Sequence, residues 1–166
     1  MRRLEEFILE KLKINKPKTK YAPKDKQELI DIIIADIESN GPTCSLNTID
    51  VSNITDMSYL FRGGDKDKYF GGHPTLSKFN GDISNWDVSN VTNMQGMFDD
   101  CKYSGNNGDI SDWDVSSVKD MEYMFYNNSN FNGDISDWDV SNVKYMGNMF
   151  VKSPLANNMP AWYKNR

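Results

Sequence analysis

The chain has 166 residues, of which 38% are hydrophobic, and its formal net charge is −5 at pH 7. This length fits one domain or one short repeat array, and the eight Phe, eight Tyr, four Trp and nine Met argue against wholesale disorder. Residues 1–40 hold nine of the 19 basic and eight of the 24 acidic residues, so the remainder is acidic, with ten basic against 16 acidic residues. An acidic body argues against nucleic acid as the main ligand and is compatible with a basic partner, a cation or simple solubility.

Residues 1–41 predict two helices joined by a linker. Apolar residues recur at a spacing of three and four between residues 4 and 12, which is typical of a short amphipathic helix. That helix either docks on the rest of the chain or pairs with another chain, so we expect a monomer or a weak oligomer formed through residues 4–12. Two prolines, Pro17 and Pro23, and six lysines between residues 13 and 26 then indicate a linker.

A second helix is expected over Lys26–Ser39, with Asp25 as its N-cap and Asn40-Gly41 as its end. More than half of its circumference is apolar, so it needs a surface on which to be buried. Since the open end of a repeat array exposes a slice of core, we expect this helix to cap that end.

A repeat organises the chain from residue 42 onward. Its copies are LNTIDVSNITDMSYLF at 46–61, FNGDISNWDVSNVTNMQGMF at 79–98, GDISDWDVSSVKDMEYMF at 108–125 and FNGDISDWDVSNVKYMGNMF at 131–150. The matching Val51, Val88, Val115 and Val140 are 37, 27 and 25 residues apart, which indicates a basic unit of about 25 residues. The segment LANNMPAW at 155–162 aligns with the start of a further copy, and it predicts a C-terminal half-coil cap.

In the second copy, Ile83 begins a series of apolar positions with the spacing of leucine-rich repeats. Trp86–Val88 predicts a short strand, and the spacing of three and four from Val91 predicts one or two helical turns. Stacked copies would bury three columns: Trp86/Trp113/Trp138, Met94/Met121/Met146 and Phe98/Phe125/Phe150. The predicted fold class is therefore an α/β repeat, a short leucine-rich-repeat-like solenoid of about four and a half coils with an N-terminal helical cap. Residues 1–41 would hold the amphipathic helix, linker and capping helix, and residues 42–166 the solenoid and its half-coil cap.

The recurring Gly81, Gly108 and Gly133 predict a tight turn with positive φ, beside aspartates that fit Asx turns. The first interval contains an insertion at residues 62–78, which predicts a surface loop. Tyr69 and Phe70 in that loop are either candidate contact residues, because exposed aromatic side chains anchor interfaces, or residues that pack back over the coil. The single histidine, His73, is expected to be an exposed loop residue and not a metal ligand.

Carboxylates recur at the outward positions of the predicted strands. Asp50, Asp87, Asp114 and Asp139 would form one row, and Asn85, Asp112 and Asp137 a second. Two explanations remain open. In the first, each aspartate of the first row caps the turn that follows it. In the second, the rows form a binding face for a basic peptide or a divalent ion.

No catalytic motif is recognisable: the sequence lacks a Gly-rich phosphate loop, HExxH, GxSxG and a nucleophilic Cys paired with a His. We expect no enzyme activity, no cofactor and no metal site.

Cys44 and Cys101 are either reduced thiols or a disulfide. Acidic residues interrupt the apolar start of the chain, and no stretch is long enough to span a membrane, so we expect no membrane insertion and a cytoplasmic protein as written. It would lie on the extracellular surface if a signal or an anchor had been removed.

The pattern F-N-G-D-I-S-x-W-D-V-S-N-V-x-x-M-x-x-M-F resembles the bacterial leucine-rich-type repeats of BspA-like surface proteins, over residues 42–162. The resemblance implies an adhesion or protein-binding module without enzyme activity. The chain departs from the family pattern in its short array, in the lack of a recognisable signal or anchor, and in Asn106 where other copies have phenylalanine. The expected function is a non-enzymatic protein-binding module acting through the strand face and the 62–78 loop. The alternatives are a surface adhesin fragment and a phage or mobile-element protein that is structural or inhibits a host factor.

Overall fold

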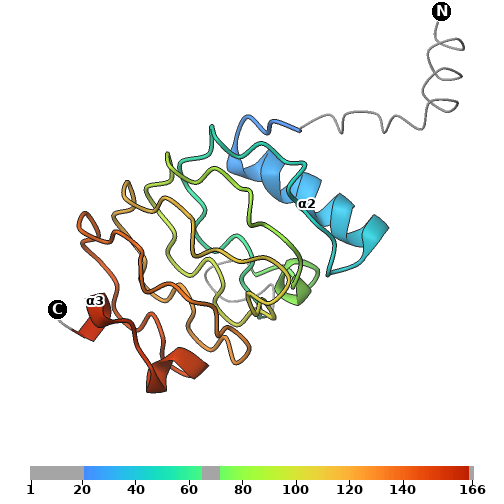
Figure 1. Ribbon diagram of the computed structural model, residues 1–166. Helices are drawn as coiled ribbons and strands as arrows, with labels where there is room; N and C mark the ends of the chain where they lie inside the picture. The colour runs from blue at the N-terminus through green and yellow to red at the C-terminus, as the bar shows by residue number, and fades with distance from the viewer. Residues whose placement is uncertain (1–20, 65–71, 165–166) are drawn as a thin grey trace, which may run out of the picture.

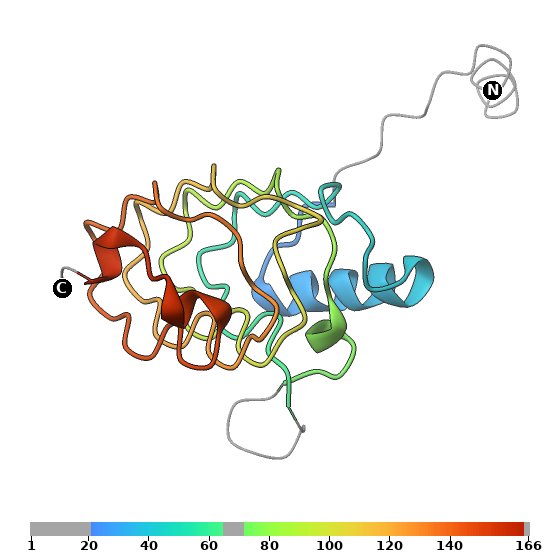
Figure 2. The same ribbon diagram turned by 60° about the horizontal axis from the view of Figure 1, so that its bottom comes forward.

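The computed structural model describes residues 21–64 and 72–164. The expected 4–12 helix, as well as Tyr69 and Phe70, lie outside the described residues. In chain order, the regular elements of the described residues are the α-helix α2 (Lys26–Asn40), the 3-10 helices η1 (Leu76–Lys78) and η2 (Pro154–Asn157), and the short α-helix α3 (Ala161–Lys164). Between α2 at one end and α3 at the other, the repeats follow one another as a stack of irregular turns (Figures 1 and 2).

The helix α2 confirms the expectation for this segment. The Asp25 carboxylate accepts a hydrogen bond from the Glu28 N–H at 2.9 Å, as an N-cap does. At the other end the Gly41 N–H donates to the Ile37 carbonyl at 2.8 Å, with Gly41 at a φ of 85° that glycine adopts without strain. The side chains of Leu29, Ile33 and Ile37 are buried, so one face of α2 joins the common core.

The repeats are joined chiefly by backbone hydrogen bonds from one repeat to the next. Between the second and third repeats, the N–H groups of Met94, Gly96, Phe98 and Asp100 donate to the carbonyls of Asp120, Glu122, Met124 and Tyr126 at 2.8–2.9 Å. The same four positions donate between the first and second repeats and between the third and fourth, at 2.7–3.0 Å. In every case the earlier repeat supplies the N–H and the later repeat the carbonyl.

The predicted α/β leucine-rich-repeat-like solenoid is wrong. Residues 21–64 and 72–164 contain no β-strand and no sheet; adjacent repeats meet only in isolated parallel bridges such as Asp56 with Asn93 and Asn93 with Asp120. Trp86–Val88 is not a strand, and the segment from Val91 to Phe98 is a series of turns and not a helix.

Left-handed backbone is one reason why the strands do not form. Equivalent positions of the four repeats, Tyr59, Gly96, Tyr123 and Asn148, all have φ between 56° and 58°. A β-strand requires negative φ throughout, so this residue ends any ladder after a single bridge. The intervening N–H groups then close turns inside their own repeat, as when the Met97 N–H donates to the Met94 carbonyl at 3.2 Å.

The core is built from the columns that the sequence predicts. The predicted tryptophans, methionines and phenylalanines are buried at 0–4% exposure, except Met146, which is partly buried in the last repeat. The rings of Phe61, Phe98, Phe125 and Phe150 stack with centroids 5.5–6.1 Å apart. These offset contacts between successive repeats add to the free energy of burial, since stacked aromatic pairs contribute about 0.5–1.5 kcal/mol each.

A second aromatic column runs beside the first, and the sequence assigned its middle position incorrectly. Phe79 and Phe131 belong to it, but their counterpart in the third repeat is Tyr103 and not Asn106. The Tyr103 ring lies 6.1 Å from Phe79 and 6.0 Å from Phe131, and its hydroxyl donates to the buried Gly108 carbonyl at 2.7 Å. Asn106 is exposed.

The tryptophans also connect the repeats through hydrogen bonds. The indole N–H of Trp113 donates to the Ile83 carbonyl of the preceding repeat at 3.3 Å, and that of Trp138 to the Ile110 carbonyl at 3.0 Å. Trp162 continues the series, with its indole N–H 2.9 Å from the Ile135 carbonyl. The alignment of residues 155–162 with the start of a repeat is therefore correct at its tryptophan.

The recurring glycines are required for a reason other than the predicted one. Gly81, Gly108 and Gly133 do not have positive φ. Instead, a Cβ on Gly81 would lie 1.9 Å from the Cys44 carbonyl oxygen of the preceding turn. The small residue allows close approach of two backbones.

We expect Gly81→Ala to destabilise the protein by more than about 2 kcal/mol, because backbone must move to admit the methyl group. The control is Gly147→Ala, whose Cβ would meet only the end of the flexible Glu122 side chain, at 3.2 Å. Urea unfolding should show a cost within about 0.5 kcal/mol for the control. Equal midpoints for the two variants would contradict the close-approach explanation.

We expect Tyr103→Phe to lower the free energy of unfolding by about 1–3 kcal/mol, because the buried Gly108 carbonyl loses its donor while the ring stack is retained. Thermal and urea unfolding of the two proteins measure the difference. A variant as stable as the wild type would indicate that water replaces the phenol.

Candidate binding face

Three members of the first aspartate row, Asp87, Asp114 and Asp139, are exposed as expected, but they lie on turns and not on strands, and the carboxylates of the row close these turns. In three of its members, Oδ1 accepts the N–H of the serine two residues on: Ser89 to Asp87 at 3.1 Å, Ser116 to Asp114 at 3.1 Å and Ser141 to Asp139 at 3.0 Å. Asp50 and Ser52 form the same turn at 3.2 Å. These are Asx turns, so the capping explanation describes one function of the row.

The turn engages only one oxygen of each carboxylate. Asp87, Asp114 and Asp139 are exposed, and within residues 21–64 and 72–164 their Oδ2 atoms have no hydrogen-bond or ion-pair partner. The negative charge of Asp139 raises the pKa of Asp114, against the stronger lowering by Ser116, so neighbouring members of the row repel one another. A cationic group placed over the row would relieve that repulsion.

The second row is exposed, and its side chains accept no turn hydrogen bond. Asn85, Asp112 and Asp137 are all exposed, and the part of the chain that the structure describes supplies no partner to the carboxylates of Asp112 and Asp137. Asn85 contributes its backbone, whose N–H donates to the Asn47 side chain of the first repeat at 3.0 Å. We call the two rows together the aspartate face.

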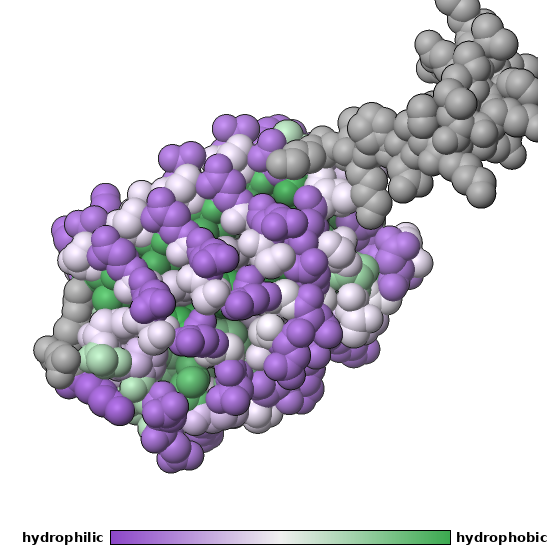
Figure 3. Space-filling view, in the orientation of Figure 1, coloured by the Kyte–Doolittle hydropathy of each residue, from purple (hydrophilic) through white to green (hydrophobic). Residues whose placement is uncertain are grey.

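A hollow adjoins this face at the third repeat. It is lined by Thr92, Ser116, Ser117, Lys119, Asn142 and Lys144. Two of these residues are lysines, so the acidic surface is bounded by basic side chains on this side. The face that Figure 3 shows is mainly hydrophilic, with hydrophobic residues visible only between polar ones.

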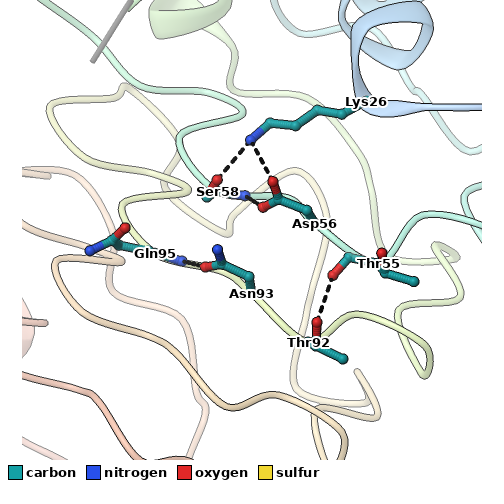
Figure 4. A network of polar contacts seen from close by, with 7 residues as sticks. All are labelled: Lys26, Thr55, Asp56, Ser58, Thr92, Asn93 and Gln95. Carbon is teal, nitrogen blue, oxygen red and sulfur yellow. Dashed lines mark hydrogen bonds and ion pairs between the residues drawn. The ribbon is translucent and has the colours of Figure 1, made fainter. Parts of the chain in front are cut away.

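A third series of turns was missed by the sequence analysis. Asp56, Asn93 and Asp120 each accept the N–H two residues on, at 2.8–3.0 Å. Asp56 also pairs with Lys26 of α2 at 3.3 Å, and the Lys26 amine donates to the Ser58 hydroxyl at 2.7 Å (Figure 4). In the sequence these turns correspond to an Asp or Asn six residues after Asp50, Asp87 and Asp114, where the apolar spacing predicts a helical turn instead.

No group of three metal-ligating side chains occurs within residues 21–64 and 72–164, and no helix there could cross a membrane. Both cysteines are free thiols. Burial raises the pKa of Cys101 to about 12, so this thiol is inert at neutral pH. His73 is partly buried and its Nδ1 accepts the Thr75 N–H at 3.2 Å, so it is part of the loop structure.

The turn hydrogen bonds lower the pKa of several carboxyls. In Asp114 the largest cause is the hydrogen bond from the Ser116 hydroxyl. In Asp82 burial has the largest effect and raises the pKa, but the hydrogen bonds led by Ser84 together outweigh it. The aspartates whose pKa lies below the usual range are Asp56, Asp82, Asp114, Asp134 and Asp139.

We expect acid to destabilise the protein as these aspartates become protonated. A carboxyl with a lower pKa in the folded state stabilises the fold above its unfolded pKa of about 3.9, and this contribution is lost as pH falls through the folded value. Urea titrations should therefore give a free energy of unfolding that is steady from about pH 7 to 5 and falls below about pH 4. Asp99 acts in the opposite sense, since burial raises its pKa despite Arg62. A flat profile below pH 4 would contradict a stabilising role for the turns.

Comparison with known proteins gives one family. The family model described as "Mycoplasma protein of unknown function, DUF285" matches residues 37–162, which include all four repeats and Trp162. Neither the curated proteins nor the solved structures include a match. The chain belongs to the DUF285 family of Mycoplasma proteins of unknown function.

Proposed function

We propose that the protein is a non-enzymatic binding module that takes a basic protein segment on its aspartate face. The observation that supports this proposal most directly is the exposed pair Asp112 and Asp137. Their carboxylates have no partner among the described residues and accept no turn hydrogen bond. Carboxylates that serve neither stability nor a neighbour are available to lysine or arginine side chains of a partner.

The first row supports the same proposal. Each exposed aspartate of that row is held in place through one oxygen by its turn, while the other oxygen accepts none of the turn's hydrogen bonds. Acceptors fixed in this way lose little conformational freedom when a partner binds.

We also propose, at the finer level of family, a relation to the BspA-like surface-protein repeats, supported by the F-N-G-D-I-S-x-W-D-V pattern.

Removing the charge without removing the turn tests the proposal. In the variant Asp112→Asn/Asp137→Asn the fold loses no hydrogen bond, and in Asp87→Asn/Asp114→Asn the amide oxygen can still accept the serine N–H. We expect peptides selected from a random library on the wild-type protein to carry a net positive charge. Their affinity should fall at least about ten-fold on each Asn variant, equal to about 1.4 kcal/mol.

The control is Asp31→Asn/Glu38→Gln, which removes two charges from the exposed side of α2. The selected peptides should bind this control as they bind the wild type. Peptides that are not basic, or an equal loss of affinity in the control, would overturn the assignment of the aspartate face. Unfolding midpoints of all variants show whether any loss reflects folding.

A further inference from the structure

The fourth repeat ends the stack with a strip of unpaired backbone donors. Its N–H groups at Met146, Asn148, Phe150 and Lys152 occupy the positions that donate to the next repeat in the first three repeats. Within residues 21–64 and 72–164 these four groups have no acceptor. We call residues 145–152 the terminal strip. These four donors occupy the places from which the equivalent groups of the earlier repeats donate to the next repeat, so this part of the strip is positive in its backbone dipoles.

The side chains of the last repeat differ from those of the inner repeats in the same sense. Residues 140–164 carry Lys144, Lys152 and Lys164 and no acidic residue, whereas the rest of the described chain carries 19 acidic and six basic residues. The end of the stack is thus basic on an otherwise acidic molecule. Figure 1 shows it at the opposite end from α2.

Apolar side chains are exposed at the same end. Tyr145 is 59% exposed and Val151 is 40% exposed, and among the described residues they are two of the three exposed large hydrophobic residues. Tyr145 occupies the position that the turn-forming Asp120 has in the third repeat. The fourth repeat therefore lacks the carboxylate that the third repeat exposes to water at this position. A basic strip with unpaired donors and exposed apolar side chains is suited to burial against an acidic surface.

The end that carries α2 has the complementary chemistry. Helix α2 contains four carboxylates and one lysine, and its exposed residues include Gln27, Asp31, Ala35 and Glu38. Since the terminal strip and α2 lie at opposite ends of the stack, a second copy of the chain can present its α2 to the strip of the first.

We propose that the protein associates head to tail, with the terminal strip of one copy on the outer side of α2 of the next. The contact pairs Lys144 and Lys152 with Asp31 and Glu38, and it covers Tyr145 and Val151. Such a contact is heterologous, so it leaves a strip and an α2 open at the two ends of every assembly and builds chains of increasing length. This self-association is independent of the proposed binding of a basic segment to the aspartate face.

The test is sedimentation velocity of the full chain over a range of concentrations at low salt. We expect the mean mass to rise with concentration, and to fall back when salt is raised from about 0.05 M to about 0.5 M, since salt screens exposed charges. The variant Lys144→Glu/Lys152→Glu and the variant Asp31→Lys/Glu38→Lys should each weaken association at least ten-fold. The quadruple variant, with both ends reversed, should recover it.

Hydrogen exchange adds a readout that follows the donors themselves. The amides of Met146, Asn148, Phe150 and Lys152 should exchange rapidly at low concentration and become protected as the protein associates. The equivalent amides of residues 120–127 bond to the fourth repeat and should stay protected throughout.

Three outcomes would overturn the proposal. One is a protein that sediments as a monomer at every concentration. Another is equal weakening by Asp112→Lys/Asp137→Lys, which would place the acidic partner surface on the aspartate face. The third is association that Ile8→Asp abolishes and both end variants leave intact, which would place the contact at residues 4–12. The first and third outcomes leave the selection of basic peptides by the aspartate face untouched, whereas the second would assign that face to self-association.

Discussion

The row of backbone hydrogen bonds that begins at Met57 runs in one direction, from each repeat to the next, although Thr92, Lys119 and Lys144 donate back to the preceding repeat at its margin. The polarity of this row makes the two ends of the stack different. In a parallel sheet each strand donates to and accepts from both neighbours, so its edges carry both kinds of group. Here each repeat donates only to the following repeat along the row that begins at Met57, because a residue with positive φ recurs within it. Stacked peptide groups of one orientation add their dipoles, as in an α-helix.

This polarity gives the two ends of the stack different requirements. The first repeat ends the row on its acceptor side, where the Arg62 carbonyl accepts the His73 N–H at 3.3 Å, and α2 begins beside it, with Lys26 bonded to Asp56 and Ser58. A cation and the start of a helix are suitable neighbours for a row of acceptors. The end at the fourth repeat presents donors, and the C-terminal segment covers the aromatic core there through Trp162 and Tyr163. The two ends are therefore unlike in chemistry, which is why a contact between copies is expected to be heterologous.

The sequence predicted the parts of the structure that depend on apolar spacing and common helix signals. The columns of Trp86, Met94 and Phe98 are buried as expected, and α2 begins and ends within one residue of its prediction. The error was to convert the spacing into a strand and a helix. Apolar spacing reports which side chains point inward, and an Asx turn with a left-handed residue can give the same alternation as a strand. The side-chain turns at Asp87 and Asn93 determine the backbone here, and they were visible only as polar residues between the apolar ones.

Tyr103 and Gly81 illustrate the other limit. The position of Tyr103 in the aromatic column depends on the path of an irregular return, which no periodicity specifies. The need for glycine at residue 81 depends on the carbonyl of Cys44, 37 residues away in sequence, so a local turn rule gave the right residue for the wrong reason.

The two rows of the aspartate face differ in the substitutions that the fold tolerates. Asp87 and its equivalents must keep an acceptor at Oδ1, because each one satisfies the N–H of a following serine. An asparagine oxygen can accept the same N–H, so the charge can be removed there with little loss of stability. An apolar residue would leave the serine N–H without an acceptor. The second row has no such constraint, and it already holds Asn85 beside Asp112 and Asp137. Partner choice is therefore expected to depend first on the second row, with the first row supplying fixed acceptors beneath it.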